Sequence, residues 1–295
     1  MTWQLAFNRY IHAPRDAWPR DKPLQARKLE EYSARQCESA DLSLARLAEQ
    51  VWAAARRRTR AGTPTLFLVN CGSSGSHWVE AMLSQLPGVH ACGEVYVPPQ
   101  LGSELQQGRP QDRATFLDAL HQVHVENAAR TADTDVLINS AHSWNPHDLM
   151  GDTAVVVGLV RDPLDVAMSR TFRKPKLRRH LTQTASDAEY LDTNIAMVEK
   201  FYRSMLRRKP AHMVRYEDVR DRAVEPLGRL ASLLGRPTPP ERLEAIAASH
   251  SAGAQSASGR RLSNVYRGGE APVPPGLFDH ATRRLERIRK DLGYA

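Results

Sequence analysis

Hydrophobic residues in the first part of the chain follow a helical spacing. Leu44, Leu47 and Val51 recur three or four positions apart, within a segment that is rich in Ala, Leu, Glu and Arg and contains no Gly or Pro. This pattern predicts one long helix over residues 24–60 with a single buried face. Prolines punctuate residues 8–23, which we expect to be irregular.

Further along the chain, short apolar runs alternate with segments of helical spacing. The run at residues 154–160 is continuously apolar, which is typical of a strand covered on both faces of a parallel sheet. This alternation predicts an α/β fold with a mostly parallel central sheet flanked by helices. We therefore expect an N-terminal helical extension, residues 1–62, and an α/β domain, residues 63–295. Strands are expected over residues 65–69, 89–92, 95–97, 136–139, 154–160 and 212–216, and helices over residues 76–86, 113–130, 163–172, 189–208, 225–234, 241–249 and 280–292.

A loop of small residues follows the first predicted strand and opens a helix. It reads Gly72-Ser73-Ser74-Gly75-Ser76-His77-Trp78. Small side chains at such a junction let backbone N–H groups curl around a phosphate, and the helix N-terminus adds partial positive charge. The loop is not of the GxxxxGK[ST] type found in nucleoside triphosphatases, because the spacing differs and no Lys precedes the Ser. An ordinary turn between a strand and a helix is the alternative.

A second candidate phosphate site follows the strand predicted at residues 154–160. Arg161 lies where this strand ends, and Ser169 lies about two turns into the helix that Pro163 begins. An arginine and a serine placed in this way can hold one phosphate together, the arginine through a bidentate fork. The alternative is an ion pair between Arg161 and Asp165, with Ser169 at the surface.

Together the two elements resemble the motifs of the sulfotransferase superfamily, whose members use 3′-phosphoadenosine 5′-phosphosulfate (PAPS). The family's 5′-phosphosulfate loop has the form PKSGTTW, where this chain reads GSSGSHW over residues 72–78. The family's 3′-phosphate motif has the form RNPxDVxxS, where this chain reads RDPLDVAMS over residues 161–169. Further similarities are VRYEDV at residues 214–219, RGG at residues 267–269 and LGY at residues 292–294. The resemblance spans residues 65–294 and implies the P-loop-like sulfotransferase fold.

The resemblance also implies a role for each matching residue. The loop would hold the 5′-phosphosulfate through its backbone and the hydroxyls of Ser74 and Ser76, and Arg161 would bind the 3′-phosphate. Trp78 and Tyr216 would lie near the adenine, and a place in the core is the alternative for both. The donor would be PAPS, the product 3′,5′-adenosine bisphosphate, and no metal is implied. The residues expected to bind the nucleotide are Gly72, Ser73, Ser74, Gly75, Ser76, His77, Trp78, Arg161, Ser169, Tyr216, Arg267, Gly268 and Gly269.

Two residues are candidates for the catalytic base, because an acceptor must lose a proton during sulfuryl transfer. Many family members place a histidine after the third strand, and His142 occupies the matching position here, with an ordinary pKa near neutrality. Carbohydrate-acting branches use a glutamate after the second strand, and Glu94 occupies that position. We place His142 first and Glu94 second.

The chain departs from the family at two lysines. The loop lysine, which reaches the bridging oxygen of the phosphosulfate in family members, is replaced by Ser73, and the lysine near the histidine is replaced by Ser140. Losing both cations removes stabilisation of the leaving group on the order of 3 kcal/mol. His77 or a basic residue from residues 173–179 or 260–261 is a candidate substitute.

Composition narrows the classes of partner. Of 295 residues, 41% are hydrophobic and 25% are charged, which excludes a mainly disordered chain. Lys and Arg outnumber Asp and Glu by 41 to 33, so the net charge of +8 favours anionic ligands. Residues 173–179 form a basic run, but no aromatic residues interleave it, so we expect it to flank a substrate mouth rather than bind nucleic acid.

The cysteines and histidines indicate no disulfide framework and no metal site. Three cysteines without CxxC spacing favour a reducing compartment, and we expect a bacterial cytoplasmic protein. No run of apolar residues approaches the length of a membrane span. His121 and His124 share a helix face, and His142 and His147 flank a loop, but no carboxylate or cysteine completes a metal-binding set in either place.

Three functions follow from these residues. The first is a PAPS-dependent sulfotransferase acting on a hydroxyl or amine of a small-molecule or carbohydrate acceptor. The second is a catalytically weak or inactive protein of the same fold that binds PAPS or adenosine bisphosphate, which the missing lysines favour. A phosphotransferase related to P-loop kinases is third, and it is disfavoured because the loop lacks their lysine.

Overall fold

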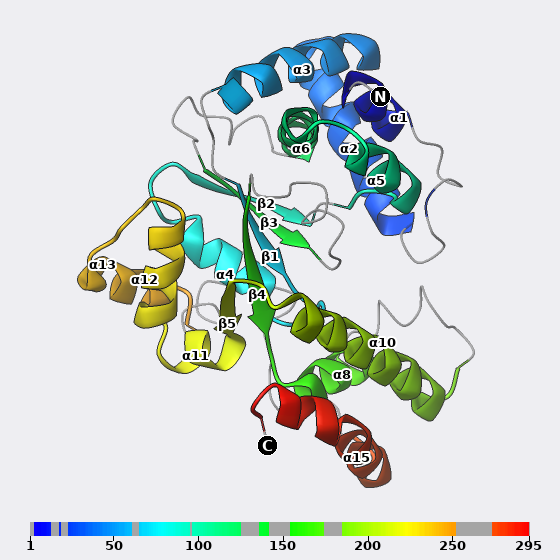
Figure 1. Cartoon of the computed structure of the whole chain (residues 1–295), viewed down its shortest axis with the longest axis vertical. Coiled ribbons are helices and arrows are strands. Elements are labelled where there is room, and N and C mark those ends of the chain that lie inside the picture. The colour runs from blue at the N-terminus through cyan, green and yellow to red at the C-terminus, as the bar shows by residue number, and fades with distance from the viewer. Residues whose placement is uncertain are drawn as a thin grey trace. The chain divides into compact units, whose positions relative to one another are not determined.

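The structure is a computed structural model that describes residues 3–12, 18, 23–60, 65–94, 96–124, 136–141, 154–173, 185–251 and 273–294. The strands form a five-stranded sheet in the order β2-β3-β1-β4-β5 (Figure 1). Strand β2 runs parallel to β3, and β4 runs parallel to β5, which confirms the predicted α/β class with a mostly parallel sheet. The strands are β1 (Thr65–Val69), β2 (Val89–Glu94), β3 (Val136–Ala141), β4 (Val155–Val160) and β5 (His212–Arg215).

The chain divides into two compact units, and each is discontinuous in sequence. The first comprises Met1–Leu68, Glu80–Val156 and Gly228–Thr238. The second comprises Val69–Val79, Val157–Leu227 and Pro239–Ala295. The predicted boundary after residue 62 lies within residues 61–64, outside the described part of the chain, and it stays a prediction.

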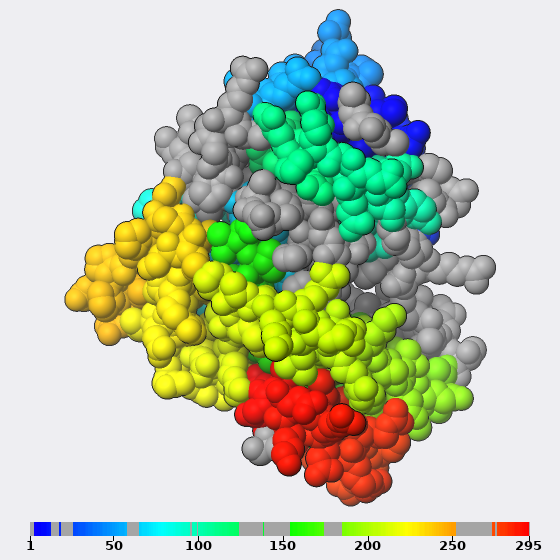
Figure 2. Space-filling view, viewed as in Figure 1, coloured from blue at the N-terminus to red at the C-terminus, as the bar shows by residue number. Residues whose placement is uncertain are grey.

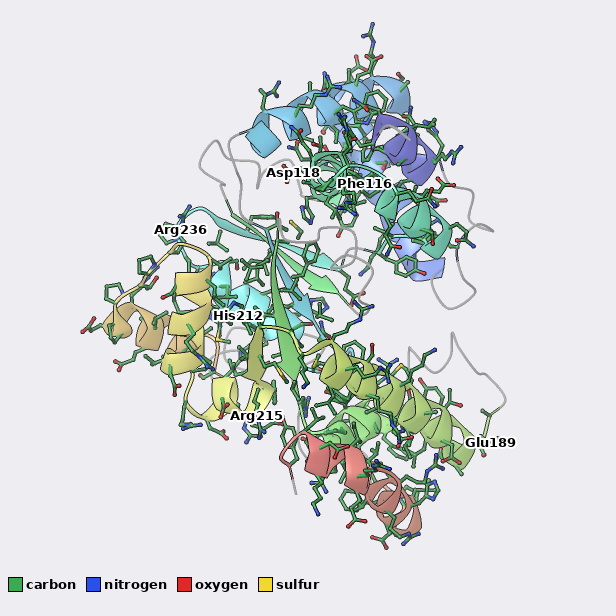
Figure 3. The ribbon with its side chains drawn as sticks, in the orientation of Figure 1. Phe116, Asp118, Glu189, His212, Arg215 and Arg236 are labelled. Carbon is green, nitrogen blue, oxygen red and sulfur yellow. The ribbon has the colours of Figure 1, made fainter. Side chains whose placement is uncertain are left out.

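The first unit has an aromatic core built by its N-terminal helices. The rings of Phe7 and Phe116 are fully buried, with centroids 6.2 Å apart in an edge-on arrangement. Tyr10 packs on the same Phe116 ring at 6.0 Å, and Trp3 packs edge-on against Trp52 at 6.1 Å. Such pairs add about 1 kcal/mol each to the burial of their area. The helices that meet here are α1 (Trp3–Ile11), α2 (Pro23–Ala40), α3 (Leu44–Arg60), α5 (Pro99–Gln106) and α6 (Pro110–His124), and Figure 3 labels Phe116 on α6.

The prediction of one helix over residues 24–60 was wrong. The helix ends at Ala40 and a second begins at Leu44, because Asp41 adopts a left-handed backbone with φ of +50°. Asp tolerates this conformation better than most residues. The hydroxyl of Ser43 then accepts a hydrogen bond from the backbone N–H of Arg46 at 3.3 Å, so the second helix starts at a serine cap. The chain thus turns without the Gly or Pro that a sequence pattern relies on.

Other boundaries differ from the predictions near the chain start and in the middle. The expected irregular stretch from residue 8 begins inside α1, which buries an apolar face on α6. Residues 96–97 of the strand expected at 95–97 are not in a strand, and α5 was not predicted at all. The helix expected at residues 113–130 begins earlier, at Pro110, and is described as far as His124.

In the second unit, three helices pack against one another. Figure 2 shows α15 lying along α10 with no gap between them on this face, and both also contact α8. Their shared core contains Val166, Ile195, Val198, Leu285 and Ile288, all at most 1% exposed. The helices are α8 (Pro163–Phe172), α10 (Asp187–Arg208), α11 (Tyr216–Asp221), α13 (Pro240–Ser249) and α15 (Pro275–Asp291), while α4 (Ser76–Leu83) and α12 (Val224–Leu233) each have residues in both units.

Local signals set the ends of several of these helices. The carboxylate of Asp162 accepts from the backbone N–H of Leu164 at 2.9 Å, and Pro163 takes the first helical position of α8. Ser186 and Glu189 form a capping box at the start of α10. Gly235 has φ of +69° just after α12, a conformation that ends helices. No helix in the described segments is both long enough and apolar enough to cross a membrane.

Candidate functional site

The loop between β1 and α4 has the backbone of an anion-binding nest. Gly72, Ser73 and Gly75 have φ of +67°, +60° and +84°. The side chain of Asn70 holds the first turn of the loop, because its Oδ1 accepts from the N–H of Gly72 at 2.9 Å. Left-handed residues next to right-handed ones turn successive N–H groups toward a common point, which is a concave site for an anion.

Ser73 has a strained backbone and a buried hydroxyl that lacks a hydrogen bond within the described chain. A non-glycine residue at this φ costs on the order of 1 kcal/mol. Its hydroxyl oxygen is buried and has no hydrogen-bond partner among the described residues. Ser74 is fully buried, and Ser76 begins α4 at 4% exposure. An anion seated in the loop would satisfy the Ser73 hydroxyl, so the loop fits a phosphate or sulfate group.

Arg161 joins the two sequence motifs. It follows β4 and is 4% exposed. Its Nη1 donates to the carbonyl oxygen of Ser73 at 3.0 Å, and its Nη2 lies 3.4 Å from Oδ2 of Asp165. The predicted 3′-phosphate residue therefore lies directly against the predicted 5′-phosphosulfate loop, and the ion pair with Asp165 also forms. Ser169 is buried two turns into α8, as the spacing predicted.

Aromatic side chains line the other side of the loop. The Tyr216 ring lies under the Arg161 guanidinium, whose central carbon is 4.5 Å from the ring centroid. Trp78 packs edge-on against Tyr216 at 5.7 Å, and its indole N–H donates to the carbonyl of His250 at 2.8 Å. Tyr216 starts α11 rather than ending a strand, because β5 stops at Arg215. The two predicted adenine residues thus lie together with Arg161.

Arg170 was missed by the sequence analysis. Its Nη1 donates to the carbonyl of Cys71 at 3.4 Å, and its Nε donates to Oδ1 of Asn194 at 3.1 Å. Asn194 is fixed in turn, since its amide nitrogen donates to Thr171 and to the carbonyl of Tyr190. No carboxylate pairs with Arg170 among the described residues. The signal was one position away, because Arg170 directly follows the motif serine.

Burial perturbs two groups beside the loop. The hydroxyl of Tyr202 donates to the carbonyl of Arg161 at 2.9 Å and accepts from its N–H at 3.3 Å. Burial raises the pKa of Tyr202 far above its ordinary value, so the hydroxyl stays protonated. Burial also raises the pKa of the Cys71 thiol to about 12, although the Arg170 charge lowers it slightly. Cys71 is therefore a neutral core residue at the base of the loop.

The two candidate bases follow neighbouring strands. Glu94 ends β2 and is half-buried, and it lies opposite Ser140 in the parallel register with β3. His142 comes two residues after Ser140 but lies outside the described residues, as do Arg267, Gly268 and Gly269. Because neighbouring parallel strands end at the same edge of a sheet, the C-terminal ends of β2 and β3 lie side by side.

The remaining histidines include one core residue. His121 is fully buried on α6, and its ring lies 6.2 Å from the ring of Phe67, so it is a core residue. The side chains of His124 and His147 lie outside the described residues. Within the described chain, no group of three or more His, Cys, Asp or Glu residues is placed to hold a metal ion.

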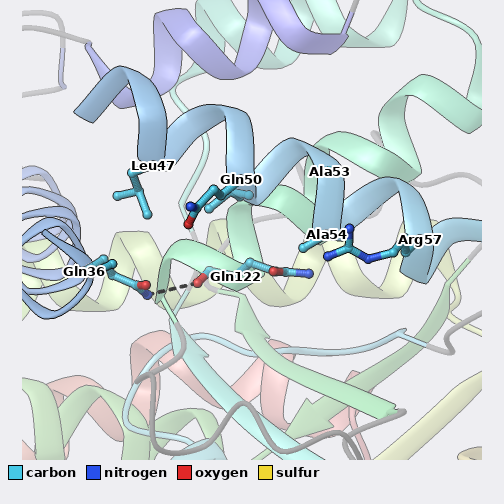
Figure 4. Close-up of a pocket in the computed structure, with 9 residues that line it drawn as sticks. Gln36, Leu47, Gln50, Ala53, Ala54, Arg57 and Gln122 are labelled. Atoms are coloured by element: carbon cyan, nitrogen blue, oxygen red, sulfur yellow. Dashed lines mark hydrogen bonds between the residues drawn. The ribbon is translucent and has the colours of Figure 1, made fainter. Parts of the chain in front are cut away.

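One pocket lies in the first unit and holds none of the predicted site residues. Its volume is about 310 Å³, and it opens between α2, α3 and α6. Figure 4 shows the side chains of Gln36, Leu47 and Arg57 around it, and the Gln36 amide donates to the backbone carbonyl of Gln122 at 3.1 Å.

Comparison with known proteins adds to this geometry. A family model described as a sulfotransferase domain matches residues 63–264, which is more than half of the chain. A crystal structure of a mouse sulfotransferase complexed with PAP is similar, with a TM-score of 0.53 and 17% identity, and covers 79% of this chain and 89% of that chain.

A sulfotransferase from Alicyclobacillus acidocaldarius has a TM-score of 0.41 at 15% identity, covering 76% of this chain and 95% of that chain. At these identities the mouse structure shows the fold alone, which is the sulfotransferase fold predicted from the motifs. Among curated proteins, none matches significantly.

Proposed function

Because the chain belongs to the sulfotransferase family, we propose that it transfers the sulfuryl group from PAPS to a hydroxyl or amine of a small-molecule or carbohydrate acceptor. The observation that carries this proposal is the 3.0 Å contact between Arg161 and the Ser73 carbonyl. It places a buried guanidinium and an anion-binding nest side by side, which is what a nucleotide with two separate phosphate groups needs.

We propose a place for each part of the donor. The N–H groups of the loop and the Ser73 hydroxyl would hold the 5′-phosphosulfate. The Arg161 guanidinium would bond to the 3′-phosphate, either in place of the Ser73 carbonyl or in addition to it. Ser169 and the RGG loop would also contact the 3′-phosphate. Tyr216 and Trp78 would flank the adenine. The full set proposed to bind the nucleotide is Gly72, Ser73, Ser74, Gly75, Ser76, His77, Trp78, Arg161, Ser169, Tyr216, Arg267, Gly268 and Gly269.

The transfer itself is a displacement at sulfur. The acceptor oxygen or nitrogen forms a bond to sulfur while the bond between sulfur and the bridging oxygen of PAPS breaks. The electron pair of that bond leaves with 3′,5′-adenosine bisphosphate, and the acceptor proton passes to a base. We propose His142 as this base, with Glu94 as the second candidate, because both follow strands that end at one edge of the sheet.

Arg170 is our candidate for the positive charge that Ser73 cannot supply. Its guanidinium reaches the loop backbone at Cys71 and has no carboxylate partner among the described residues. A half-buried guanidinium in this setting is stabilised when an anion arrives nearby. We rank Arg170 ahead of His77 and of the basic residues at 173–179 and 260–261, because its contact with the Cys71 carbonyl brings its charge to the loop backbone.

A second function keeps the same ligand without turnover. Ser73 carries no charge at the place where family members hold a lysine, and a loop that binds PAPS but cannot stabilise its leaving group would act as a sensor. This protein would bind adenosine bisphosphate through the same residues. The two proposed functions differ only in whether a sulfated product forms.

The experiment that separates these functions uses the purified protein with [35S]PAPS and a pool of metabolites. Transfer of label to an acceptor supports the sulfotransferase, and binding of adenosine bisphosphate without any labelled product supports the sensor. Arg161→Ala should strongly weaken binding of adenosine bisphosphate and lower any transfer of label, while Arg203→Ala should change neither, because Arg203 forms an exposed ion pair with Glu199. A protein that binds no adenine nucleotide would contradict both proposals.

We propose a reducing bacterial cytoplasm as the location of this protein. The cysteines at positions 37, 71 and 92 form no disulfide with one another in the described chain, which suits that compartment. We propose no nucleic-acid partner and no resident metal. We propose a hydroxyl or amine acceptor because these are the groups that take a sulfuryl group from PAPS.

A further inference from the structure

The C-terminal residues grip the turn that presents Arg161. Arg289 donates from Nε to Oδ1 of Asp162 and from Nη2 to Oδ2, at 2.9 Å in both cases. The hydroxyl of Tyr294 donates to Oε2 of Glu217 at 2.7 Å. The other oxygen of Glu217 accepts from the backbone N–H of Asp162 at 3.0 Å. Asp162, which directly follows Arg161, is therefore held at its side chain and at its backbone.

The end of the chain is itself fixed by Arg215. Its Nη2 donates to the carbonyl of Leu292 at 2.6 Å, and its Nη1 donates to the carbonyl of Gly293 at 3.2 Å. Its guanidinium also covers the Tyr294 ring, 4.7 Å from the centroid. Figure 3 labels Arg215 where β5 ends. Gly293 is required there, since it has φ of +74° and a Cβ atom would lie 2.8 Å from the Arg215 guanidinium.

These contacts form one network that ends at Asp162, the residue after the candidate 3′-phosphate residue. We call Arg289 and Glu217, which bond to Asp162, together with Tyr294, which bonds to Glu217, the C-terminal clasp. Arg289 and Asp162 are each about one-fifth exposed, so their bidentate pair is shielded from solvent and is stronger than a surface pair. Burial and the bond to Glu217 raise the pKa of Tyr294, so its hydroxyl remains a donor throughout the working range of pH.

We propose that the C-terminal clasp positions Arg161 for the 3′-phosphate, and that Tyr294 and Glu217 are positioning residues for donor binding. The proposal rests on the proposed function for the identity of the ligand. Tyr202 holds the backbone of Arg161 on one side, and the clasp holds the next residue on the other. A guanidinium whose backbone is fixed on both sides loses little conformational entropy when it binds a phosphate.

The first test needs no ligand and measures amide hydrogen exchange in the free protein. The N–H groups of Asp162 and Leu164 are bonded to Glu217 and to the Asp162 carboxylate rather than within the helix. Tyr294→Phe should therefore speed exchange in a peptide covering residues 160–168, whereas Tyr32→Phe, on α2, should leave that peptide unchanged. Unchanged exchange in Tyr294→Phe would contradict the clasp.

The second test measures nucleotide affinity by calorimetry. Tyr294→Phe should lower the affinity for 3′,5′-adenosine bisphosphate by roughly 5–20-fold. It should lower the affinity for adenosine 5′-monophosphate by less than about 2-fold, because only the bisphosphate has a 3′-phosphate. In an Arg161→Ala background the effect of Tyr294→Phe should vanish, as expected for a residue that acts through Arg161. Equal losses for both nucleotides, or a loss that persists in that background, would show that Tyr294 is merely structural.

The two tests separate failure of the clasp from failure of the proposed function. If the wild-type protein binds neither nucleotide, the proposed donor is wrong, and hydrogen exchange alone decides whether the clasp holds the turn. If the nucleotides bind but Tyr294→Phe and Glu217→Gln change neither exchange nor the ratio of affinities, the clasp is wrong and the donor stands.

Discussion

The ring of Tyr216 occupies the space that a side chain on Gly75 would need. A Cβ atom on Gly75 would lie 2.5 Å from Cδ2 of the ring and 2.6 Å from Cε2, and Gly75 has φ of +84°. The same ring carries the Arg161 guanidinium on its face. The loop, the aromatic ring and the arginine are thus packed with no room for a single methyl group.

Gly75→Ala should therefore disrupt the site. The methyl group must displace the Tyr216 ring or unwind the loop, and the left-handed backbone adds strain on the order of 1 kcal/mol. We expect bisphosphate affinity to fall by at least about tenfold in a titration, with a lower melting temperature. Gly102→Ala on α5 is the matched control, because nothing lies within 4 Å of its Cβ position and its backbone φ is ordinary. Equal affinities for the two variants would contradict the loop assignment.

Arg170 gives a prediction that differs from that for Arg161. If its charge acts on the 5′ end of the donor, Arg170→Gln should lower the affinities for 3′,5′-adenosine bisphosphate and for adenosine 5′-monophosphate to a similar extent, roughly 5–30-fold. Arg170→Lys should recover part of the affinity, since the charge remains while the bond geometry is lost. Arg203→Gln on α10 serves as the exposed control. If Arg170→Gln binds both nucleotides as tightly as the wild-type protein, Arg170 only supports the packing of α8 on α10.

The base is tested by comparing two variants at one donor concentration. If His142 takes the proton, His142→Ala should lower kcat by roughly 10²–10⁴ while donor binding survives, because a base acts in the transition state. The wild-type rate should then rise with pH around the ordinary histidine pKa of about 6.5. Glu94→Gln should have the smaller effect. The reverse order of the two losses would assign the base to Glu94.

Cys71 predicts a loss of stability at alkaline pH. Its pKa is raised from 9.0 to about 12 by burial, so between these values the folded protein keeps a proton that the unfolded chain releases. The free energy of unfolding must fall as pH rises through this window, and the contribution is fully present below pH 9.

Urea denaturation at pH 8 and pH 10 measures the effect of this thiol. The wild-type protein should lose on the order of 1 kcal/mol more than Cys71→Ala between the two pH values. Comparing the change with pH, rather than the stability itself, cancels the cavity that the alanine creates. Equal changes in both proteins would show that the thiol already ionises freely in the folded state.

Much of the fold could be predicted from local patterns. Residues 157–160 of the apolar run in β4 are buried, and Pro163 begins α8, as expected. These features depend on residues within a few positions of each other, where backbone sterics and side-chain periodicity decide the outcome. The junction of small residues between β1 and α4 was predicted in the same way, and its role as a phosphate loop stays a prediction. The break at Asp41 was missed because its turn uses a left-handed aspartate that no pattern marks.

The sequence by itself determined the parallel sheet and most of the helices, and it supplied the motifs to which we assign the chemistry. Only the tertiary structure decided which side chains meet. Arg161 contacts a carbonyl 88 residues away, Arg170 one 99 residues away, and Asp162 a carboxylate 55 residues away. No local signal specifies such pairs, because they depend on the order of parallel strands and on where α15 packs. The contact of Arg170 with the loop and the contacts around Asp162 follow from that packing, since a side chain can hold a distant backbone group only after the fold has brought the two together.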